Sequence, residues 1–402
     1  MQAGGRGQGD RLSADARFVI GAQAARALAY GLGSVLIGVT LAGRGYSGTE
    51  AGVVLTAMLA GSALVSVLLA RHGDLIGRRR CYGALFVAMA LAGAVFALSG
   101  SLLALILVAL TGTVSTDVVE SGPFTSLEQA MLSHASSGDP TRLFGTYNAV
   151  ATLAGSIGAL IALVGSSSHW LLVYPLAACL GLGASLALSS GVERGRELEH
   201  DPRPPLHRSR GIVLRLGGLF ALDSFGGGFV AQTFIAYLFT RKYDASPHTL
   251  AIVFFAIGLL QALSFQAAVR LAERFGLLRT MVFSHLPSNL LLVAVAFAPT
   301  LGSAIALLVA RFALSQMDVP TRQAYVMGVV DPSERTAAAA YTNTARYVTR
   351  PVAPVVAGAA LGAGLGFPFV IAGALKSVYD VGLYLLFREV TLDRESAARP
   401  VD

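Results

Sequence analysis

The sequence predicts an all-α membrane protein with twelve transmembrane helices, and three observations lead to this fold class. Of the 402 residues, 54% are hydrophobic and 13% are charged, whereas soluble domains carry about 25% charged residues. The apolar runs are about 20 residues long, which is the length a helix needs to cross a bilayer. Arginines collect on alternate connections between these runs. Membrane β-barrels instead alternate polar and apolar residues over about ten positions, a pattern that this chain lacks.

The apolar runs form two sets of six around a polar segment. The first six occupy residues 18–41, 51–70, 81–98, 101–130, 143–164 and 170–190. The second six occupy residues 212–239, 249–272, 278–298, 302–329, 336–361 and 367–388. Charged residues and prolines mark segment 191–211 as a linker. We therefore expect two six-helix bundles, 18–190 and 212–388, with polar tails at 1–17 and 389–402.

The distribution of basic residues predicts the orientation of the chain. If both termini are cytoplasmic, 21 of the 30 lysines and arginines fall in cytoplasmic segments. The loops on the other side then hold only Arg44, Arg241 and Lys242, and the rest lie within the apolar runs. Such an excess on one side is the positive-inside pattern. We therefore expect both tails and the linker in the cytoplasm.

The two halves of the sequence repeat each other. Residues 71–80 read RHGDLIGRRR and residues 270–279 read RLAERFGLLR. A constant offset of 199 aligns Asp74, Gly77 and Arg80 with Glu273, Gly276 and Arg279. Because each half has an even number of runs, both copies have the same orientation. Parallel repeats of this kind are typical of transporters whose solute site lies between the halves near mid-membrane.

The loop GDLIGRRR resembles the signature between helices 2 and 3 of the major facilitator superfamily, and the resemblance extends over nearly the whole chain. In that family the acid of this loop pairs with arginines on the cytoplasmic face and helps latch the two halves. The resemblance assigns this role to Asp74, with Arg78 and Arg80 as basic partners and Gly77 as the turn residue. The second copy of this latch consists of Glu273, Gly276 and Arg279.

An aspartate interrupts the apolar run 212–239. A carboxylate in such surroundings costs several kcal/mol unless a partner offsets it. The match between RGYS (44–47) and RKYD (241–244) has an offset of 197, which places Asp223 opposite Arg26 in run 18–41. Ionisable residues within membrane spans are functional candidates by default. We expect Arg26 and Asp223 to approach each other, or to share substrate or a proton, in the central cavity; a static ion pair is the alternative.

Runs 101–130 and 302–329 carry a second set of charges. The first holds Asp117, Glu120 and Glu128, and the second holds Arg311, Asp318 and Arg322. An offset of 194 aligns Asp117 with Arg311 and Glu128 with Arg322. We expect Asp117, Glu120, Arg311 and Asp318 to lie deep, as candidates for the substrate or proton site. We expect Glu128 and Arg322 nearer the cytoplasm, as part of the latch.

The last two runs add three basic residues and one acid. Arg346 and Arg350 lie four residues apart and share a helix face, and guanidinium groups suit carboxylates and phosphates. They are further candidates for the substrate site; pairing with Asp318 or the acids of run 101–130 is the alternative. Lys376 and Asp380, also four apart, predict an ion pair within one helix. The deep basic residues concentrate in the second half, which favours an anionic or zwitterionic solute.

The sequence therefore predicts a secondary active transporter that moves a small organic solute across the bacterial cytoplasmic membrane by alternating access. We expect protons to drive it, carried by Asp223, Asp117, Glu120 or Asp318, and export to be the direction. Run 143–164 lacks the Gly-Pro pattern of the family's drug–proton exporters, so a proton-coupled importer of an organic anion or zwitterion is the alternative. A non-transporting membrane sensor or scaffold would need no buried charges.

Several other function classes are disfavoured. The chain has no GxxxxGK[ST] loop for a nucleotide, and it shows no metal-ligand cluster or pairing of a nucleophile with a base. Its seven histidines are scattered and lie mostly near predicted loops. We expect no enzyme activity, no cofactor and no nucleic-acid partner. The expected partners are the lipid bilayer, the solute and the coupling proton, and the chain is expected to function as a monomer.

Overall fold

The computed structural model of the chain is built from α-helices and short 3-10 turns. It describes residues 13–115, 122–135, 140–165, 167–189, 206–331 and 334–390. No strand occurs within these ranges. The all-α fold class predicted from the apolar runs is therefore confirmed.

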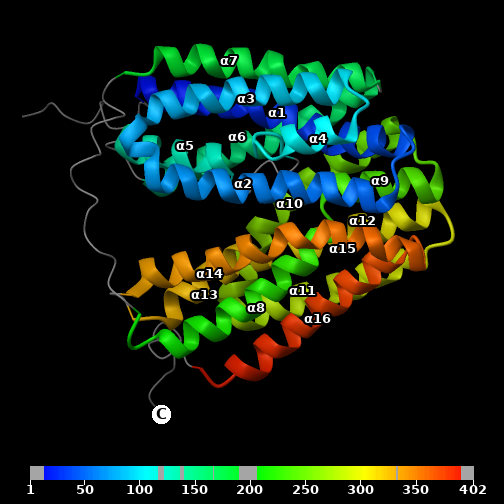
Figure 1. The fold of residues 1–402 in the computed structure, drawn as a ribbon. Helices are drawn as coiled ribbons and strands as arrows, with labels where there is room; N and C mark the ends of the chain where they lie inside the picture. The colour runs from blue at the N-terminus through cyan, green and yellow to red at the C-terminus, as the bar shows by residue number, and fades with distance from the viewer. Residues whose placement is uncertain are drawn as a thin grey trace, which may run out of the picture. The chain divides into compact units, whose positions relative to one another are not determined.

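The helices follow the predicted runs in order (Figure 1). The first half contains α1 (Ala14–Gly43), α2 (Gly48–Ile76), α3 (Arg78–Leu98), α4 (Leu102–Ala109), α5 (Pro123–Ala135), α6 (Pro140–Leu160) and α7 (Val173–Ala187). The second half contains α8 (Arg210–Gly228), α9 (Gln232–Tyr243), α10 (Pro247–Phe275), α11 (Leu277–Ala296), α12 (Leu301–Ser315), α13 (Asp318–Val329), α14 (Arg335–Thr349), α15 (Ala353–Ala360) and α16 (Phe367–Phe387).

Several predicted runs are split into two helices at glycines or prolines. Run 212–239 breaks after the glycine triplet at 226–228, where α8 ends. Glycine is a poor helix former, so three in succession favour an end at this point. Run 302–329 breaks between α12 and α13, and Pro320 lies in the first turn of α13. A proline there removes no helical hydrogen bond, because the first N–H groups of a helix have no partner within it.

Ten segments of the described residues are long and apolar enough to cross a membrane. The two predicted runs not among them are 101–130 and 336–361. The first includes residues outside the described ranges. The second contains Arg346 and Arg350, and Pro351 and Pro354 divide it into α14, a 3-10 turn (Arg350–Val352) and α15.

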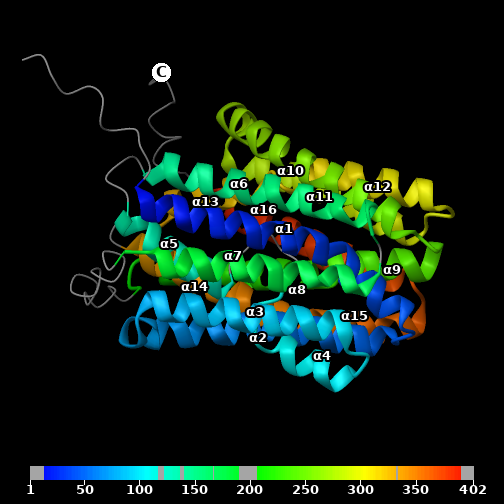
Figure 2. The ribbon, with the colours of Figure 1, turned by 90° about the horizontal axis from the view of Figure 1, so that it is seen from above.

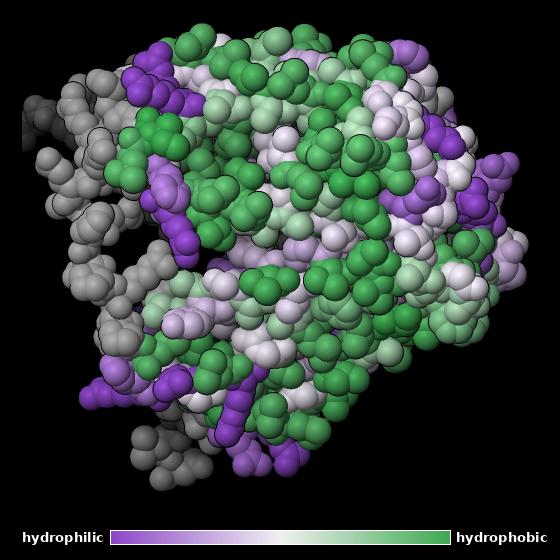
Figure 3. Space-filling view, in the orientation of Figure 1, coloured by the Kyte–Doolittle hydropathy of each residue, from purple (hydrophilic) through white to green (hydrophobic). Residues whose placement is uncertain are grey.

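Large apolar side chains cover much of the helix surface. In Figure 3 hydrophobic side chains occupy broad areas along the helices, and hydrophilic ones gather toward the helix ends. Leu64 in α2, Leu107 in α4 and Leu263 in α10 are each more than half exposed. Water would disfavour such a surface and hydrocarbon would not, so the helices present the face expected toward lipid. The chain is a multi-pass membrane protein.

The helices form two compact units. Unit 1 consists of Met1–Arg44, Ala57–Asp201 and Pro247–Phe255, and unit 2 consists of Gly45–Thr56, Pro202–Ser246 and Ala256–Asp402. The first turns of α2 belong to unit 2 and those of α10 belong to unit 1, and the predicted bounds of the two bundles stay predictions. The predicted linker 191–211 and both predicted tails lie largely outside the described ranges.

In unit 1, α1 packs against α6 and α7, and α3 lies along α7 (Figures 1 and 2). The contact between α1 and α6 is close enough to require glycine. A Cβ atom on Gly31 would lie 1.8 Å from the carbonyl oxygen of Gly155. Small residues allow such close helix packing in membranes. The short helix α4 lies beside α3.

In unit 2, α8 packs against α14 and α16, and α11 packs against α12, α13 and α16. An aromatic core fills the space between these helices. It includes Phe220, Tyr325 and Tyr379, each at most 2% exposed. These packed helices fix the positions of the buried charges described below.

The two loops of the sequence repeat have the same backbone form. Gly77 alone separates α2 from α3, and Gly276 alone separates α10 from α11. Both glycines have positive φ angles, 101° and 85°. A side chain disfavours such angles, so the aligned glycines are required by the turn. The predicted repeat is therefore also a structural one at these two loops.

Candidate functional site

The buried charges of unit 1 meet at Glu128 of α5. Its Oε2 accepts a hydrogen bond from Nη2 of Arg26 in α1 at 2.6 Å. The hydroxyl of Tyr82 in α3 donates to Oε1 at 2.8 Å, and that of Tyr147 in α6 donates to Oε2 at 2.5 Å. Glu128 is 0% exposed and Arg26 is 3% exposed. We call these four residues the Glu128 cluster; it joins four helices.

Two aromatic rings cover the guanidinium group of Arg26. Its Cζ lies 5.2 Å from the ring centroid of Tyr30 and 4.9 Å from that of Phe124. A cation near the face of an aromatic ring is attracted by the ring's quadrupole. The Nε of Arg26 has no hydrogen-bond partner, but the carboxylate of Glu128 has three. One acid and one base therefore form a nearly complete, neutral cluster.

Asp223 of α8 is the centre of a second group of charges, in unit 2. Its Oδ1 lies 2.5 Å from Nζ of Lys376 in α16, and its Oδ2 lies 3.4 Å from Nη1 of Arg322 in α13. The same Nη1 donates to Oδ2 of Asp318, one turn earlier in α13, at 2.7 Å. All four side chains are buried. We call these four residues the Asp223 cluster.

Asp380 of α16 is held by groups that carry no permanent charge. Nδ1 of His285 in α11 lies 2.9 and 3.0 Å from its two carboxylate oxygens. Asn289, one turn further along α11, donates to Oδ2 at 2.8 Å. On the other side of the ring, Nε2 of His285 lies 3.9 Å from Oδ1 of Asp223. The imidazole therefore lies between two carboxylates and links Asp380 to the Asp223 cluster.

Three more arginines predicted for the site belong to unit 2. Arg311 of α12 is 5% exposed, and its Nε and Nη1 have no hydrogen-bond partner among the described residues. Arg346 and Arg350 are half-buried. Arg346 adds to the positive field at Asp223. With Arg322 and Lys376 these three arginines make five basic side chains, two of them half-buried, around the three acids Asp223, Asp318 and Asp380.

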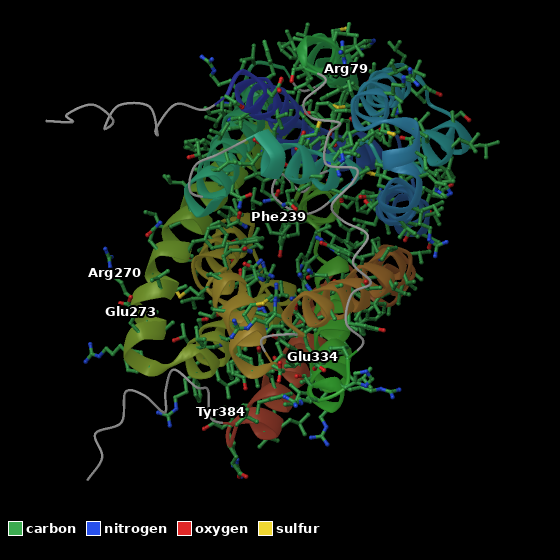
Figure 4. All side chains as sticks on the ribbon, turned by 90° about the vertical axis from the view of Figure 1, so that its left-hand side faces the viewer. Arg79, Phe239, Arg270, Glu273, Glu334 and Tyr384 are labelled. Carbon is green, nitrogen blue, oxygen red and sulfur yellow. The ribbon has the colours of Figure 1, made fainter. Side chains whose placement is uncertain are left out.

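Glu334, at the start of α14, binds the segment that leads into α8 (Figure 4). Its Oε1 accepts hydrogen bonds from the backbone N–H groups of His207 and Arg208 at 2.7 and 3.0 Å. Its Oε2 accepts one from Ser209 at 2.8 Å. These bonds, from His207 first and then from Ser209, lower the pKa of Glu334 to about 2. The carboxylate thus anchors the segment that leads into α8 to the start of α14.

The sequence places Arg26 and Asp223 together, and the structure gives each a partner within its own unit. Arg26 binds Glu128, whereas Asp223 binds Lys376 and Arg322. Because Arg26 and Asp223 belong to different units, their predicted approach stays a prediction. Glu128 and Arg322, expected at the latch, are buried in the two clusters, and their latch role also stays a prediction.

Some predicted residues lie at loops or outside the described structure. Asp117 and Glu120 fall outside the described ranges, as does the side chain of Asp74. Arg78 is buried, and its Nη1 lies 3.5 Å from the carbonyl oxygen of Ala130. The exposed members of the predicted latch are Arg80, Glu273 and Arg279. Figure 4 shows Glu273 on α10 together with Arg270.

The predicted ion pair between Lys376 and Asp380 is wrong. Lys376 binds Asp223, and Asp380 binds His285 and Asn289. Both side chains of α16 reach across to neighbouring helices, because α8 and α11 also bury polar groups that need partners. A pair within α16 would have left those groups without them.

His285 was missed by sequence reasoning, which grouped it with histidines near loops. It lies in the middle of α11 and is 3% exposed. Its position within the apolar run 278–298 could have identified it as a functional candidate, because a titratable side chain inside a membrane span is rare. Tyr82 and Tyr147 carry no comparable signal, since uncharged tyrosines are common in such runs. Within the described residues, no group of His, Cys, Asp or Glu side chains is arranged to hold a metal ion.

Comparisons with known proteins agree on one family. The family model of the Major Facilitator Superfamily matches residues 19–354. An uncharacterized membrane protein of Saccharomyces cerevisiae, YJR124C, is 25% identical over 411 residues, which cover 90% of this chain and 91% of the yeast protein.

Solved structures of transporters have the same fold. The nucleoside transporter NupG is similar with a TM-score of 0.72 and 14% identity, covering 93% of this chain and 98% of NupG. A D-xylose-proton symporter is similar with a TM-score of 0.67 and 13% identity, covering 92% of this chain and 97% of the symporter. With the family match, these findings lead to one conclusion: the chain belongs to the Major Facilitator Superfamily and is a membrane transporter of small solutes.

Proposed function

We propose that the chain is a proton-coupled transporter that exports a small organic solute across the cytoplasmic membrane by alternating access. The observation that carries this proposal is the buried His285–Asp380 pair beside the Asp223 cluster. Ionisable side chains inside membrane spans are costly, and they are typical of proton and substrate pathways. Both termini are cytoplasmic in this proposal, which follows the excess of arginines on one side of the predicted topology.

The geometry of unit 2 favours Asp380 and His285 as the proton-carrying pair. Asp223 binds Lys376 and Arg322, and Asp318 binds Arg322, so both carboxylates face permanent positive charges. Asp380 has only the imidazole of His285 and the amide of Asn289 as hydrogen-bond partners among the described residues. Asp223 and Asp318 are bound by permanent cations, whereas Asp380 is bound by a side chain that can itself take up and release a proton, so we assign the coupling proton to the His285–Asp380 pair.

The position of His285 couples that proton to the Asp223 cluster. Protonation of the ring places a positive charge 3.9 Å from Asp223. This charge competes with Lys376 and Arg322 for the same carboxylate. Gain and loss of one proton thus change which contacts Asp223 makes, and we propose that this change drives the rocking of the two units. The likeness to a D-xylose-proton symporter supports a proton as the coupling ion.

A flux assay tests this proposal. The purified chain is reconstituted into liposomes that contain the pH-sensitive dye pyranine, and nucleosides, pentoses, dipeptides or small carboxylates are added outside. We expect at least one solute class to drive proton movement. We expect His285→Gln to abolish that movement, and the matched substitution His248→Gln, at an exposed histidine, to leave it unchanged.

Two results would contradict the proposal. If folded protein moves no protons with any solute, proton coupling is wrong. If His285→Gln moves protons as fast as the unmodified chain, coupling does not pass through the His285–Asp380 pair.

A further inference from the structure

Among the residues that the structure describes, Arg311 is a buried cation without an ion-pair partner. It lies on α12 and is 5% exposed, and its Nε and Nη1 atoms form no hydrogen bond. No described carboxylate lies within 4.0 Å of its guanidinium group. Asp223 and Asp318 act on it only through their longer-range field. The ring of the neighbouring Phe312 lies 4.5 Å from its Cζ and supplies no negative charge.

A second unsatisfied polar group lies one turn further along the same helix. Ser315 is 4% exposed, and its hydroxyl also has no hydrogen-bond partner. Serine hydroxyls inside helices commonly donate to the carbonyl four residues earlier, and this one does not. Residues four apart share a helix face, with Cβ atoms about 5–6 Å apart. The face of α12 therefore presents a guanidinium group and a hydroxyl side by side.

Arg322 is a buried arginine whose charge, unlike that of Arg311, is paired with acids of the protein. It is also 5% exposed, and its Nη1 binds both Asp318 and Asp223. Lys376 takes the remaining oxygen of Asp223, and His285 and Asn289 hold Asp380. The three described acids of this region are thus bound by other groups. A buried charge without a counter-ion is unfavourable, and no acid among the described residues is left to bind Arg311.

We propose that Arg311 and Ser315 bind the anionic group of the transported solute, a carboxylate or a phosphate. A guanidinium group presents several donors in one plane and suits both kinds of oxyanion. A hydroxyl one turn away adds one further donor. This assignment rests on the proposed transport function, because it names the class of solute that the transporter recognises.

The first part of the test compares two arginines of equal burial without any solute. Arg311→Met and Arg322→Met are purified, and their melting temperatures are measured. Removing an unpaired charge leaves no partner behind, whereas removing Arg322 takes away the cation that binds Asp318 and one of the two that bind Asp223. We expect Arg311→Met to melt at or above the temperature of the unmodified chain and Arg322→Met to melt at least about 5 °C lower. An equal loss in both variants would overturn the proposal.

The second part measures anion binding as a shift in melting temperature. The probes are benzoate against benzamide, and glucose 1-phosphate and inorganic phosphate against glucose, at constant ionic strength. We expect at least one anion, and none of the neutral partners, to raise the melting temperature of the unmodified chain. We expect Arg311→Met to lose this shift, Arg311→Lys to keep part of it, and Ser315→Ala to reduce it. The benzoate and phosphate arms show which oxyanion the site prefers.

The outcomes separate this site from the proposed transport. If no anion stabilises the chain, or if Arg311→Met responds as the unmodified chain does, the site is wrong even where proton flux is observed. If the anion shift depends on Arg311 while no solute drives proton movement in liposomes, the site stands and proton coupling fails.

Discussion

The Glu128 cluster of unit 1 and the charged region of unit 2 differ in how completely their charges are paired. In unit 1, one arginine and two tyrosines bind one carboxylate, and the charges cancel. In unit 2, three acids face a larger number of basic side chains, and one histidine lies between two carboxylates. Arg311 has no acidic partner within the described part of the chain. A cluster whose charges are all paired gains little from binding a ligand or a proton, whereas a cluster with an unpaired charge gains more. We infer that unit 1 holds a structural pair and that unit 2 holds the variable chemistry.

The largest loss of stability is expected for a substitution in unit 1. Glu128→Gln leaves Arg26 buried without a counter-charge, and breaking a buried pair in this way costs about 3–5 kcal/mol. We expect a marked fall in the melting temperature of the purified protein. The double variant Arg26→Gln/Glu128→Gln removes both charges and is expected to recover part of the loss. Equal losses in the single and double variants would show that the two side chains are not energetically coupled.

Asp223→Asn is expected to destabilise the protein less than Glu128→Gln, by no more than the lower end of the range of about 3–5 kcal/mol for breaking a buried pair. Arg322 keeps Asp318 as its partner, so only Lys376 loses its bound acid. Thermal unfolding measures the loss, with Asp244→Asn at an exposed position as the control for the substitution itself. A loss as large as that of Glu128→Gln would indicate that unit 2 also depends on one indispensable ion pair.

The two repeat loops give a matched comparison that should show no difference between the units. Gly77→Ala and Gly276→Ala each force a side chain into a positive φ angle, at a cost of about 1–2 kcal/mol. We expect equal falls in melting temperature, because each glycine alone forms its turn. If one substitution is silent, that loop relaxes and the structural equivalence of the two turns fails.

The smallest expected effect concerns Glu334, and it depends on pH. Its folded pKa of about 2 lies below the ordinary value of 4.5, so its stabilisation is complete above the ordinary value and is lost as pH falls through the folded one. We expect Glu334→Gln to lower the melting temperature at pH 7 by a few degrees. The gap between variant and unmodified chain should narrow below about pH 4.5 and close near pH 2. A difference in melting temperature that stays constant with pH would show that packing, and not the charge of Glu334, stabilises the contact between α14 and the segment before α8.

The fold was predictable from the sequence because it depends on composition and periodicity. Apolar runs of the right length predict spans, and the repeated loops predicted that Gly77 and Gly276 would be turn residues, as both are. The glycine triplet at 226–228, where run 212–239 is split, is a local feature of the same kind. These features are local, so the chain carries their signal within a few residues.

The partners of the buried charges were only partly predictable. Spacing along a helix predicts a pair between Lys376 and Asp380, but packing of α16 against α8 and α11 turns each side chain to a different neighbour. Offsets between the repeats identify equivalent positions, and they do not determine which residues touch. The partners of His285 could not be predicted from the sequence either, because only the packed helices show that its ring lies between two acids.

Proton flux in liposomes most directly tests whether unit 2, and not unit 1, carries the variable chemistry. The measurement compares Arg26→Gln/Glu128→Gln with His285→Gln/Asp380→Asn, at equal amounts of folded protein, with a solute that drives flux in the unmodified chain. We predict that the unit 1 variant retains flux and that the unit 2 variant loses it. Loss of flux in the folded unit 1 variant, or full flux in the unit 2 variant, would contradict the account.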